Sequence, residues 1–129
     1  LGPIDPDAVP VICQTSDYAV TGYPRTALVD VNLAATAASA VGIAIEPVMS
    51  LDGGASWTSL NPNPSRTTVP SPGFGMVADV AQRNLDVAQN VRFGARLSRG
   101  GIAGTVDLAD SRCELRVLVY NRNGTTSPR

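Results

Sequence analysis

Residues 90–99 read Asn-Val-Arg-Phe-Gly-Ala-Arg-Leu-Ser-Arg, and residues 113–121 read Cys-Glu-Leu-Arg-Val-Leu-Val-Tyr-Asn. In both stretches apolar residues alternate with polar or small ones, which is the two-residue period of a half-buried β-strand. The apolar face of the first stretch is formed by Val91, Phe93, Ala95 and Leu97, and that of the second by Cys113, Leu115, Val117 and Val119. The pattern therefore predicts two strands that each turn one side toward a core.

The same alternation recurs in the rest of the chain. Residues 26–33 and 41–46 repeat it, and residues 105–108 have the composition of a short strand. Gly100 and Gly101 predict a hairpin turn, because glycine adopts the positive φ angles that such turns need. The alanine-rich residues 34–40 fit either a short helical turn or a continuation of the sheet. About seven short strands separated by Gly, Pro and Asn predict an all-β domain, a single β-sandwich of jelly-roll-like type.

Two segments are harder to assign. Residues 60–74 hold four prolines, at positions 62, 64, 70 and 72, and this density predicts a surface loop. Residues 77–89 contain Asp-Val-Ala-Gln twice, at 79–82 and 86–89. This seven-residue spacing suits a helix and equally suits two short strands, and we favour a chance repetition of the tetrapeptide.

The chain of 129 residues has the length of one domain. Residues 1–12 contain Pro3, Pro6 and Pro10, which exclude a helix and a central strand, so we expect an extended arm that ends in an edge strand over residues 9–14. We assign residues 13–121 to the β-sandwich and residues 122–129 to a flexible C-terminal tail.

The residue types that are missing limit the chemistry. The sequence has no histidine and no lysine, so it lacks the usual acid and base near neutral pH and the lysine of Schiff-base or phosphate-binding sites. A hydrolase that uses two of the eleven carboxylates is the remaining enzymatic alternative. Calcium at Asp5 and Asp7, or at Asp52, is the remaining metal alternative, although such acids are usually solvated turn residues. We predict a protein that is not an enzyme and binds no metal or cofactor.

Charge is low overall but unevenly distributed. The net charge is −1, which attracts the chain neither to nucleic acid nor to an anionic membrane, and no apolar run approaches the about 20 residues that span a bilayer. Residues 1–82 carry two arginines against seven acids, and residues 83–129 carry eight arginines against four acids. These charges either pair across neighbouring strands or form two surfaces of opposite sign that favour head-to-tail association.

Two cysteines, Cys13 and Cys113, lie 100 positions apart, which is neither a metal-binding nor a redox-motif spacing. If both lie in terminal strands of one sandwich, a disulfide would close a long loop and stabilise the fold by roughly 4–5 kcal/mol in the chain-entropy model. Such a bond implies an oxidising compartment. The alternative is a bond from Cys13 to Cys113 of the next subunit.

One short motif stands out. Residues 50–57 read Ser-Leu-Asp-Gly-Gly-Ala-Ser-Trp, with Ser50, Asp52, Gly54 and Trp57 at the fixed positions. The octapeptide resembles the Asp-box, Ser-x-Asp-x-Gly-x-Thr-Trp, of sialidases and other β-propellers, and departs from it only at Ser56. The resemblance implies a β-hairpin turn capped by the Ser and Asp side chains, with the Trp packed beneath it, away from any catalytic centre. A single copy does not make a propeller, so we expect a hairpin between strands near Val48 and Leu60 and no sialidase activity.

Trp57, the only tryptophan, has two interpretations. It is more often an anchor of the core or of a hairpin than a platform for a ligand. The alternative is a sugar-stacking side chain that forms a carbohydrate site with Tyr18, Tyr23 or Tyr120.

These features favour a structural or assembly subunit of an extracellular filament, surface layer or virion surface. The layout, with one cysteine on an N-terminal arm and another beside a late strand, is similar to that of disulfide-linked bacterial appendage pilins. We expect a homo-oligomer or polymer at the cell surface or on a virion. The candidate interface comprises Arg92, Arg96, Arg116, Leu118 and Tyr120. The alternative function is a carbohydrate-binding or adhesin module for a surface glycan.

Overall fold

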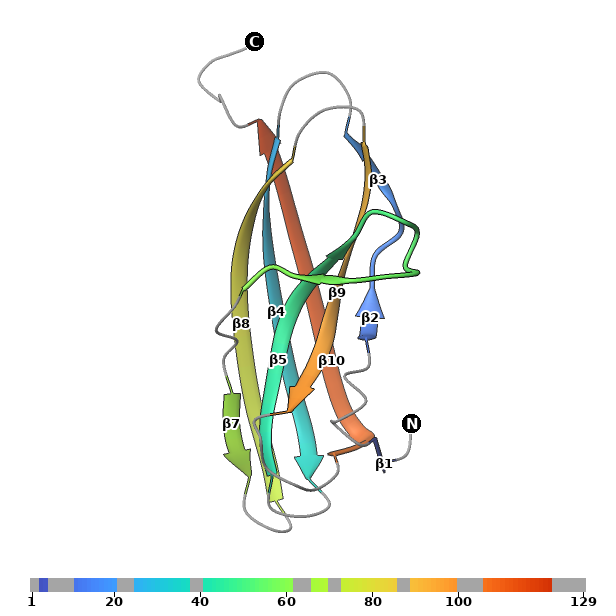
Figure 1. The fold of residues 1–129 in the computed structure, drawn as a ribbon. Coiled ribbons are helices and arrows are strands. Elements are labelled where there is room, and N and C mark those ends of the chain that lie inside the picture. Colours follow the sequence, from blue (N-terminus) through green and yellow to red (C-terminus); the bar gives the residue numbers. More distant parts are fainter. Residues whose placement is uncertain are drawn as a thin grey trace.

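Two antiparallel β-sheets pack face to face in a computed structural model of the chain (Figure 1). The structure describes residues 3–4, 11–20, 25–37, 41–61, 66–69, 73–85, 89–99 and 106–121. Its strands are β1 (Pro3–Ile4), β2 (Val11–Gln14), β3 (Tyr18–Val20), β4 (Arg25–Ala37), β5 (Val41–Ser50), β6 (Thr58–Ser59), β7 (Arg66–Val69), β8 (Gly73–Leu85), β9 (Gln89–Arg99) and β10 (Val106–Asn121). No helix occurs among these residues, so the predicted all-β sandwich is confirmed.

Sheet A has the strand order β1-β10-β4-β8, in which β10, β4 and β8 are long and β1 is short. The central strand, β4, pairs along its whole length with β8, from Arg25 opposite Leu85 to Ala37 opposite Gly73. On its other side it pairs with β10, where Cys113 lies opposite Leu33. The three strands run along the long axis of the molecule (Figure 1).

Sheet B has the order β2-β9-β5-β6, with β3 also pairing with β9 and β7 with β5. Its centre is the β5–β9 pair, in which Ile45 lies opposite Leu97 and Met49 opposite Phe93. The flanking strands β2, β3, β6 and β7 are short. Sheet B therefore has two long strands with several short strands along their edges.

The core lies between the sheets, because alternate side chains of each long strand point inward. The fully buried apolar residues from the two sheets include Val29, Val31, Val91, Phe93 and Leu97. The half-buried Cys113, Leu115, Val117 and Val119 pack against them. These inward faces are the ones that alternation predicts in residues 26–33, 90–99 and 113–121.

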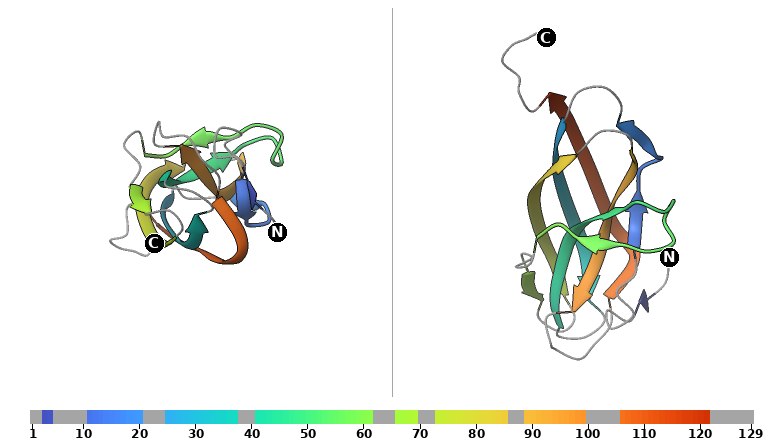
Figure 2. Two further views of the ribbon diagram at one scale, coloured as in Figure 1. Left: turned by 90° about the horizontal axis from the view of Figure 1, so that it is seen from below. Right: turned by 45° about the horizontal axis from the view of Figure 1, so that its top comes forward.

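The outer face of sheet B is covered by the chain's own hairpin. After β5 the chain turns back, and the segment that contains β6 crosses in front of β5 and β9 (Figures 1 and 2). The Leu60 amide donates to the Pro47 carbonyl at 2.9 Å. As a result Glu46, Val48 and Ser50 are buried although they lie on the outer side of β5.

The structure resolves the ambiguous segments in favour of strands. Of the ambiguous residues 77–89, residues 77–85 lie in one continuous strand, β8, and not in a helix. Residues 86–88 lie outside the described residues, and Gln89 begins β9. Residues 106–108 and 113–121 belong to a single strand, β10, whose register shifts between Asp107 and Arg112, and residue 105 lies outside the described residues. The loop predicted over residues 60–74 contains β7 and the start of β8, and the sheet continues through Ala37.

The described residues of the predicted N-terminal arm belong to both sheets. Pro3 and Ile4 pair with Asp107 and Val106 of β10, and β2 begins at Val11. The predicted boundary after residue 12 therefore falls inside a strand. Other predictions lie outside the described residues: the Gly100–Gly101 turn, the tail at 122–129, Tyr23, Asp5 and Asp7.

We expect Gly94→Ala to destabilise the fold by about 1–3 kcal/mol, the usual cost of overpacking. A methyl group at Gly94 would lie 3.1 Å from the Trp57 ring and 3.1 Å from the Cys13 carbonyl oxygen, so either the hairpin or β2 has to move. Urea denaturation measures the change. Ala78→Gly, on an exposed position of β8, is the control for an alanine–glycine exchange in a strand. A Gly94→Ala variant as stable as the wild type would contradict this packing.

Candidate functional site

The outer face of sheet A is an array of side chains from β10, β4 and β8. The antiparallel registers place one residue of each strand in every row across the face. Successive rows are Leu118–Leu28–Gln82, Arg116–Asp30–Val80, Glu114–Asn32–Ala78 and Arg112–Ala34–Met76. Each row is a set of cross-strand neighbours whose side chains interact directly.

This face exposes an unusual amount of apolar surface. Seven large apolar side chains are exposed among the described residues, and five of them lie here: Leu28, Met76, Val80, Leu118 and Tyr120. Met76 is 71% exposed and Leu118 59% exposed. Single exposed apolar residues are ordinary, but a concentration of them on one face is typical of an interaction surface.

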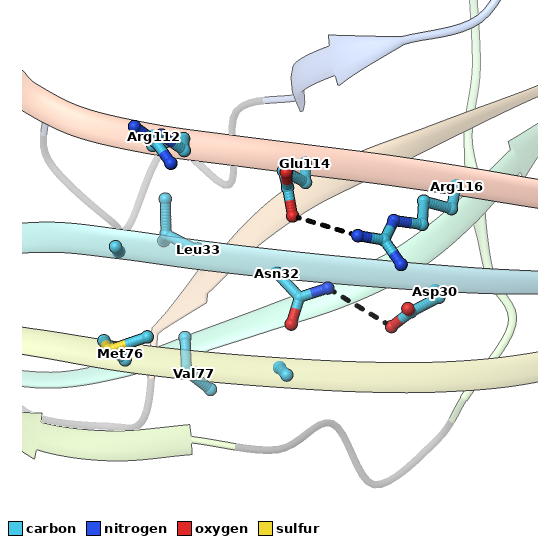
Figure 3. Close-up of a pocket in the computed structure, with 10 residues that line it drawn as sticks. Asp30, Asn32, Leu33, Met76, Val77, Arg112, Glu114 and Arg116 are labelled. Carbon is cyan, nitrogen blue, oxygen red and sulfur yellow. Dashed lines mark hydrogen bonds and ion pairs between the residues drawn. The ribbon is translucent and has the colours of Figure 1, made fainter.

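Charged residues form a strip through the same face. Arg112, Arg116, Glu114 and Asp30 line an open depression of about 800 Å³, together with Asn32, Ala34, Met76 and Ala78 (Figure 3). Arg116 Nη2 lies 3.7 Å from Glu114 Oε1, and Asn32 donates to Asp30 at 3.4 Å. Both partners of the ion pair are exposed, so it contributes little stability. The strip has two positive and two negative groups and is close to neutral.

Arg92 and Arg96 do not belong to this face. Both are on β9 in sheet B, and both are paired with acids. Arg92 Nε contacts Asp17 at 3.0 Å and Arg92 Nη1 donates to Gln14 at 2.8 Å. The candidate interface therefore divides: Arg116, Leu118 and Tyr120 share one face, whereas the two β9 arginines lie on the other sheet.

Arg96 forms the centre of a buried polar network. Its Nε donates to Glu46 Oε2 at 3.0 Å and its Nη2 to Ser59 Oγ at 2.9 Å, while Ser59 donates to Glu46 Oε1. Glu46 is 6% exposed. The network ties β6 to the outer side of β5 and β9. In both β9 ion pairs an arginine of the second half of the chain meets an acid of the first half, as expected if charges pair across neighbouring strands.

The 50–57 segment forms a capped hairpin turn. Ser50 Oγ donates to Asp52 Oδ1 at 2.6 Å and accepts from the Gly54 amide at 2.9 Å. The Ser56 amide donates to Asp52 Oδ1 at 2.9 Å, and the Ser56 hydroxyl donates to Asp52 Oδ2. Gly54 has a φ of +99°, which only glycine adopts easily. β6 then pairs with β5, with Val48 opposite Ser59.

These hydrogen bonds have an electrostatic consequence. Donation from Ser50 and then from Ser56 stabilises the carboxylate and holds the pKa of Asp52 well below its usual range. The charged form is therefore the one that organises the turn.

Among the described residues, the aromatic side chains proposed for a carbohydrate site are divided between the two sheets. Trp57 is half-buried and packs on the Gly94 backbone, where it anchors the hairpin to sheet B. Tyr18 lies on β3, which pairs with β9, whereas Tyr120 lies on the outer face of sheet A. Tyr18 and Tyr120 thus belong to different sheets.

Cys13 and Cys113 meet where the two sheets adjoin. Their sulfur atoms are 2.9 Å apart, although one is on β2 of sheet B and the other on β10 of sheet A. Both thiols are half-buried and pack against the core. The hydrogen bond between the two sulfurs lowers the pKa of the Cys13 thiol and raises the pKa of Cys113.

The described residues contain no group of three Cys, Asp or Glu side chains placed to hold a metal ion. They also include no helix that is long and apolar enough to cross a membrane. Comparison of the chain with protein-family models, with curated proteins and with solved structures finds no match.

The apolar part of the face was only partly visible in the sequence. The alternation of residues 113–121 places Leu118 and Tyr120 opposite the core side, but Leu28, Met76 and Val80 were not selected. The exposure of Leu28 could have been predicted from the sequence, because Leu28 lies on the same face of residues 26–33 as the polar Asp30 and Asn32. The exposure of Met76 and Val80 could not have been predicted, because the sequence did not decide between helix and strand for this segment. The inward face of the strand also carries a charged residue, the buried Asp79.

We expect Asp52→Asn to lower stability at pH 7, because the amide lacks the charge that the serine donors stabilise. A depressed folded-state pKa contributes stability above the unfolded pKa of about 4, and this contribution is lost as pH falls toward the folded value. The difference in urea midpoint between wild type and variant should therefore shrink from pH 7 to pH 3. A difference independent of pH would contradict a role for the carboxylate.

We expect Arg96→Met to destabilise the protein by about 3 kcal/mol, because it leaves Glu46 buried without its cation. The double variant Glu46→Leu/Arg96→Met removes both charges and should recover much of the loss. Urea denaturation of the wild type, the two single variants and the double variant gives the coupling free energy between Glu46 and Arg96. Additive effects of the two substitutions would show that the pair is not coupled.

Proposed function

We propose that the protein is a non-enzymatic assembly subunit that acts outside the cytoplasm, and that it associates with a second copy through the outer face of sheet A. The observation that carries this proposal is the concentration of exposed apolar side chains on that one face. Covering them with another protein removes apolar surface from water, which is the main driving force of association.

The contrast between the two sheets supports the choice of face. Sheet B buries the outer side of its central strands under its own hairpin, through Trp57 and the Glu46–Arg96–Ser59 network. Sheet A has exposed apolar residues at the corresponding positions of all three long strands. The chain covers the outer face of sheet B with its own hairpin. In this proposal a second copy covers the outer face of sheet A.

The charge of the face favours a second copy over a strongly charged partner. Arg112 and Arg116 are balanced by Glu114 and Asp30, so two identical faces do not repel each other. A nucleic acid or an anionic surface selects for one sign of charge instead.

The area of the outer face of sheet A sets the expected strength of the contact between two copies. Ten residues of β10 at about 3.3 Å each, across three strands about 4.8 Å apart, give roughly 450 Å² per copy. Two copies then bury about 900 Å², just below the usual range of stable interfaces. We therefore expect a weak, reversible contact, and a filament, surface layer or virion surface would combine it with at least one further contact.

The absence of histidine and lysine supports a role without catalysis. A place outside the cytoplasm is supported by the adjacency of Cys13 and Cys113, because a disulfide between them would form and persist in an oxidising compartment.

We expect Leu118→Lys to weaken self-association at least tenfold, about 1.4 kcal/mol, because it removes apolar contact and places a charge in the interface. Sedimentation velocity over a concentration series measures the dimer. The matched control is Leu51→Lys: Leu51 is 57% exposed, close to the 59% of Leu118, but it lies in the hairpin turn.

Equal loss in both variants would indicate a general effect of charge and not of this face. A wild-type protein that stays monomeric up to about 1 mM, the range of the weakest specific contacts, would overturn the proposal.

A further inference from the structure

We propose that Cys13 and Cys113 of one chain are a redox site whose oxidised form is an intramolecular disulfide joining the two sheets. The inference does not rest on the proposed self-association, since it concerns the inner side of β10 and not its outer face. It also selects between the two disulfides that the sequence leaves open.

The position of the two thiols carries the inference. The sulfur atoms are already 2.9 Å apart. A disulfide requires about 2.05 Å, so each sulfur has to move by less than about 0.5 Å. A cysteine with such a neighbour in its own chain forms an intramolecular bond in preference to one with another subunit, because the effective concentration of the neighbour is far higher.

The local structure explains why a bond is useful here. β2 is an edge strand of sheet B and is held by three register pairs to β9, with a shift between Val11 and Cys13. From Arg112 to Asn121, β10 has no paired strand on the side away from β4 among the described residues. The bond would fasten a short strand of one sheet to the open edge of the other.

The pair also has the asymmetry that thiol–disulfide exchange needs. The hydrogen bond between the two sulfurs, in which either can donate, lowers the pKa of Cys13 and raises the pKa of Cys113. Both thiols are partly exposed, but the carboxylate of Glu114 lies next to Cys113 in the chain and further disfavours a thiolate there. The thiolate is the reactive form of cysteine. Cys13 is therefore the residue that attacks first, and Cys113 is the resolving residue.

The reaction needs an external small-molecule disulfide as oxidant, such as oxidised glutathione. The Cys13 thiolate attacks one sulfur of that disulfide, a mixed disulfide forms, and the first glutathione leaves as a thiolate. This thiolate takes the proton of Cys113, whose sulfur then attacks Sγ of Cys13 and displaces the second glutathione. Two protein thiols are oxidised to one disulfide, and one glutathione disulfide is reduced to two thiols.

The experiment uses the full chain in a series of reduced and oxidised glutathione mixtures. After alkylation of free thiols with iodoacetamide, intact-mass and peptide mass spectrometry identify the product. We expect a monomer that is lighter than the reduced chain by two hydrogen atoms, takes up no alkyl group, and yields one cross-linked peptide containing Cys13 and Cys113. The oxidised protein should melt about 10 °C or more above the reduced protein, as expected when a 100-residue loop is closed.

Two single variants test the order of attack. In Cys113→Ser the serine hydroxyl still donates to Cys13, so Cys13 should form a mixed disulfide with glutathione. In Cys13→Ser the remaining Cys113 thiol should react at least about tenfold more slowly. Each variant is the control for the other, since both lack the intramolecular bond.

Three results would overturn the proposal: a disulfide-linked dimer or ladder as the main oxidised product, two alkylated thiols after oxidation, or equal melting temperatures of the oxidised and reduced wild type. Because the redox and melting comparisons use the wild-type chain, they do not depend on the folding of any variant. A monomeric result in the association experiment with Leu118→Lys leaves this inference unaffected.

Discussion

The pairing of β4 with β10 on one side and β8 on the other is the constraint on which the rest of the structure depends. Side chains alternate between the faces of a strand, so a slip of one residue in either pairing would exchange the core face with the solvent face. With the observed register, Val29 and Val31 enter the core while Leu28 and Asp30 face outward. The same register assembles the rows of the outer face and places Cys113 on the inner side near Cys13.

The outer faces of the two sheets differ in what covers them. Sheet B buries Glu46 there, where it meets Arg96 and Ser59, and the hairpin that covers it is closed by the exposed Asp52 and its serine donors. Sheet A has apolar side chains there, and its charges are exposed and weakly paired. Satisfied buried polar groups fix one conformation of the chain itself, whereas exposed apolar groups gain free energy only from association. The sandwich therefore has one face shaped by folding and another suited to binding.

Much of the fold could be predicted from sequence because alternation is a local property. Residues 26–33, 90–99 and 113–121 display it directly, and Asp52 with two glycines identifies a turn by its own chemistry. Residues 73–85 could not be assigned, because Asp79 faces inward and Val80 outward, the reverse of the usual pattern. Asp79 is tolerated inside because Asn61 donates to both of its carboxylate oxygens, at 3.1 and 3.0 Å. A contact between residues 18 positions apart in the chain leaves no trace in local periodicity. Local periodicity also does not show which sheet a strand joins, and this is why the sequence alone grouped Arg92 and Arg116 on one surface.

Strand β10 connects the two sites inferred for this protein. Its inner side carries Cys113, which meets Cys13, and its outer side carries Arg116 and Leu118, two positions apart on the same face. A bond between the cysteines would fix the edge strand from within while leaving the outer face free, because neighbouring residues of a strand point to opposite sides. If the covalent link stays inside each chain, association between chains depends on the apolar face alone. Such an assembly would be strengthened by oxidation through the stability of its subunit, and not through bonds between subunits.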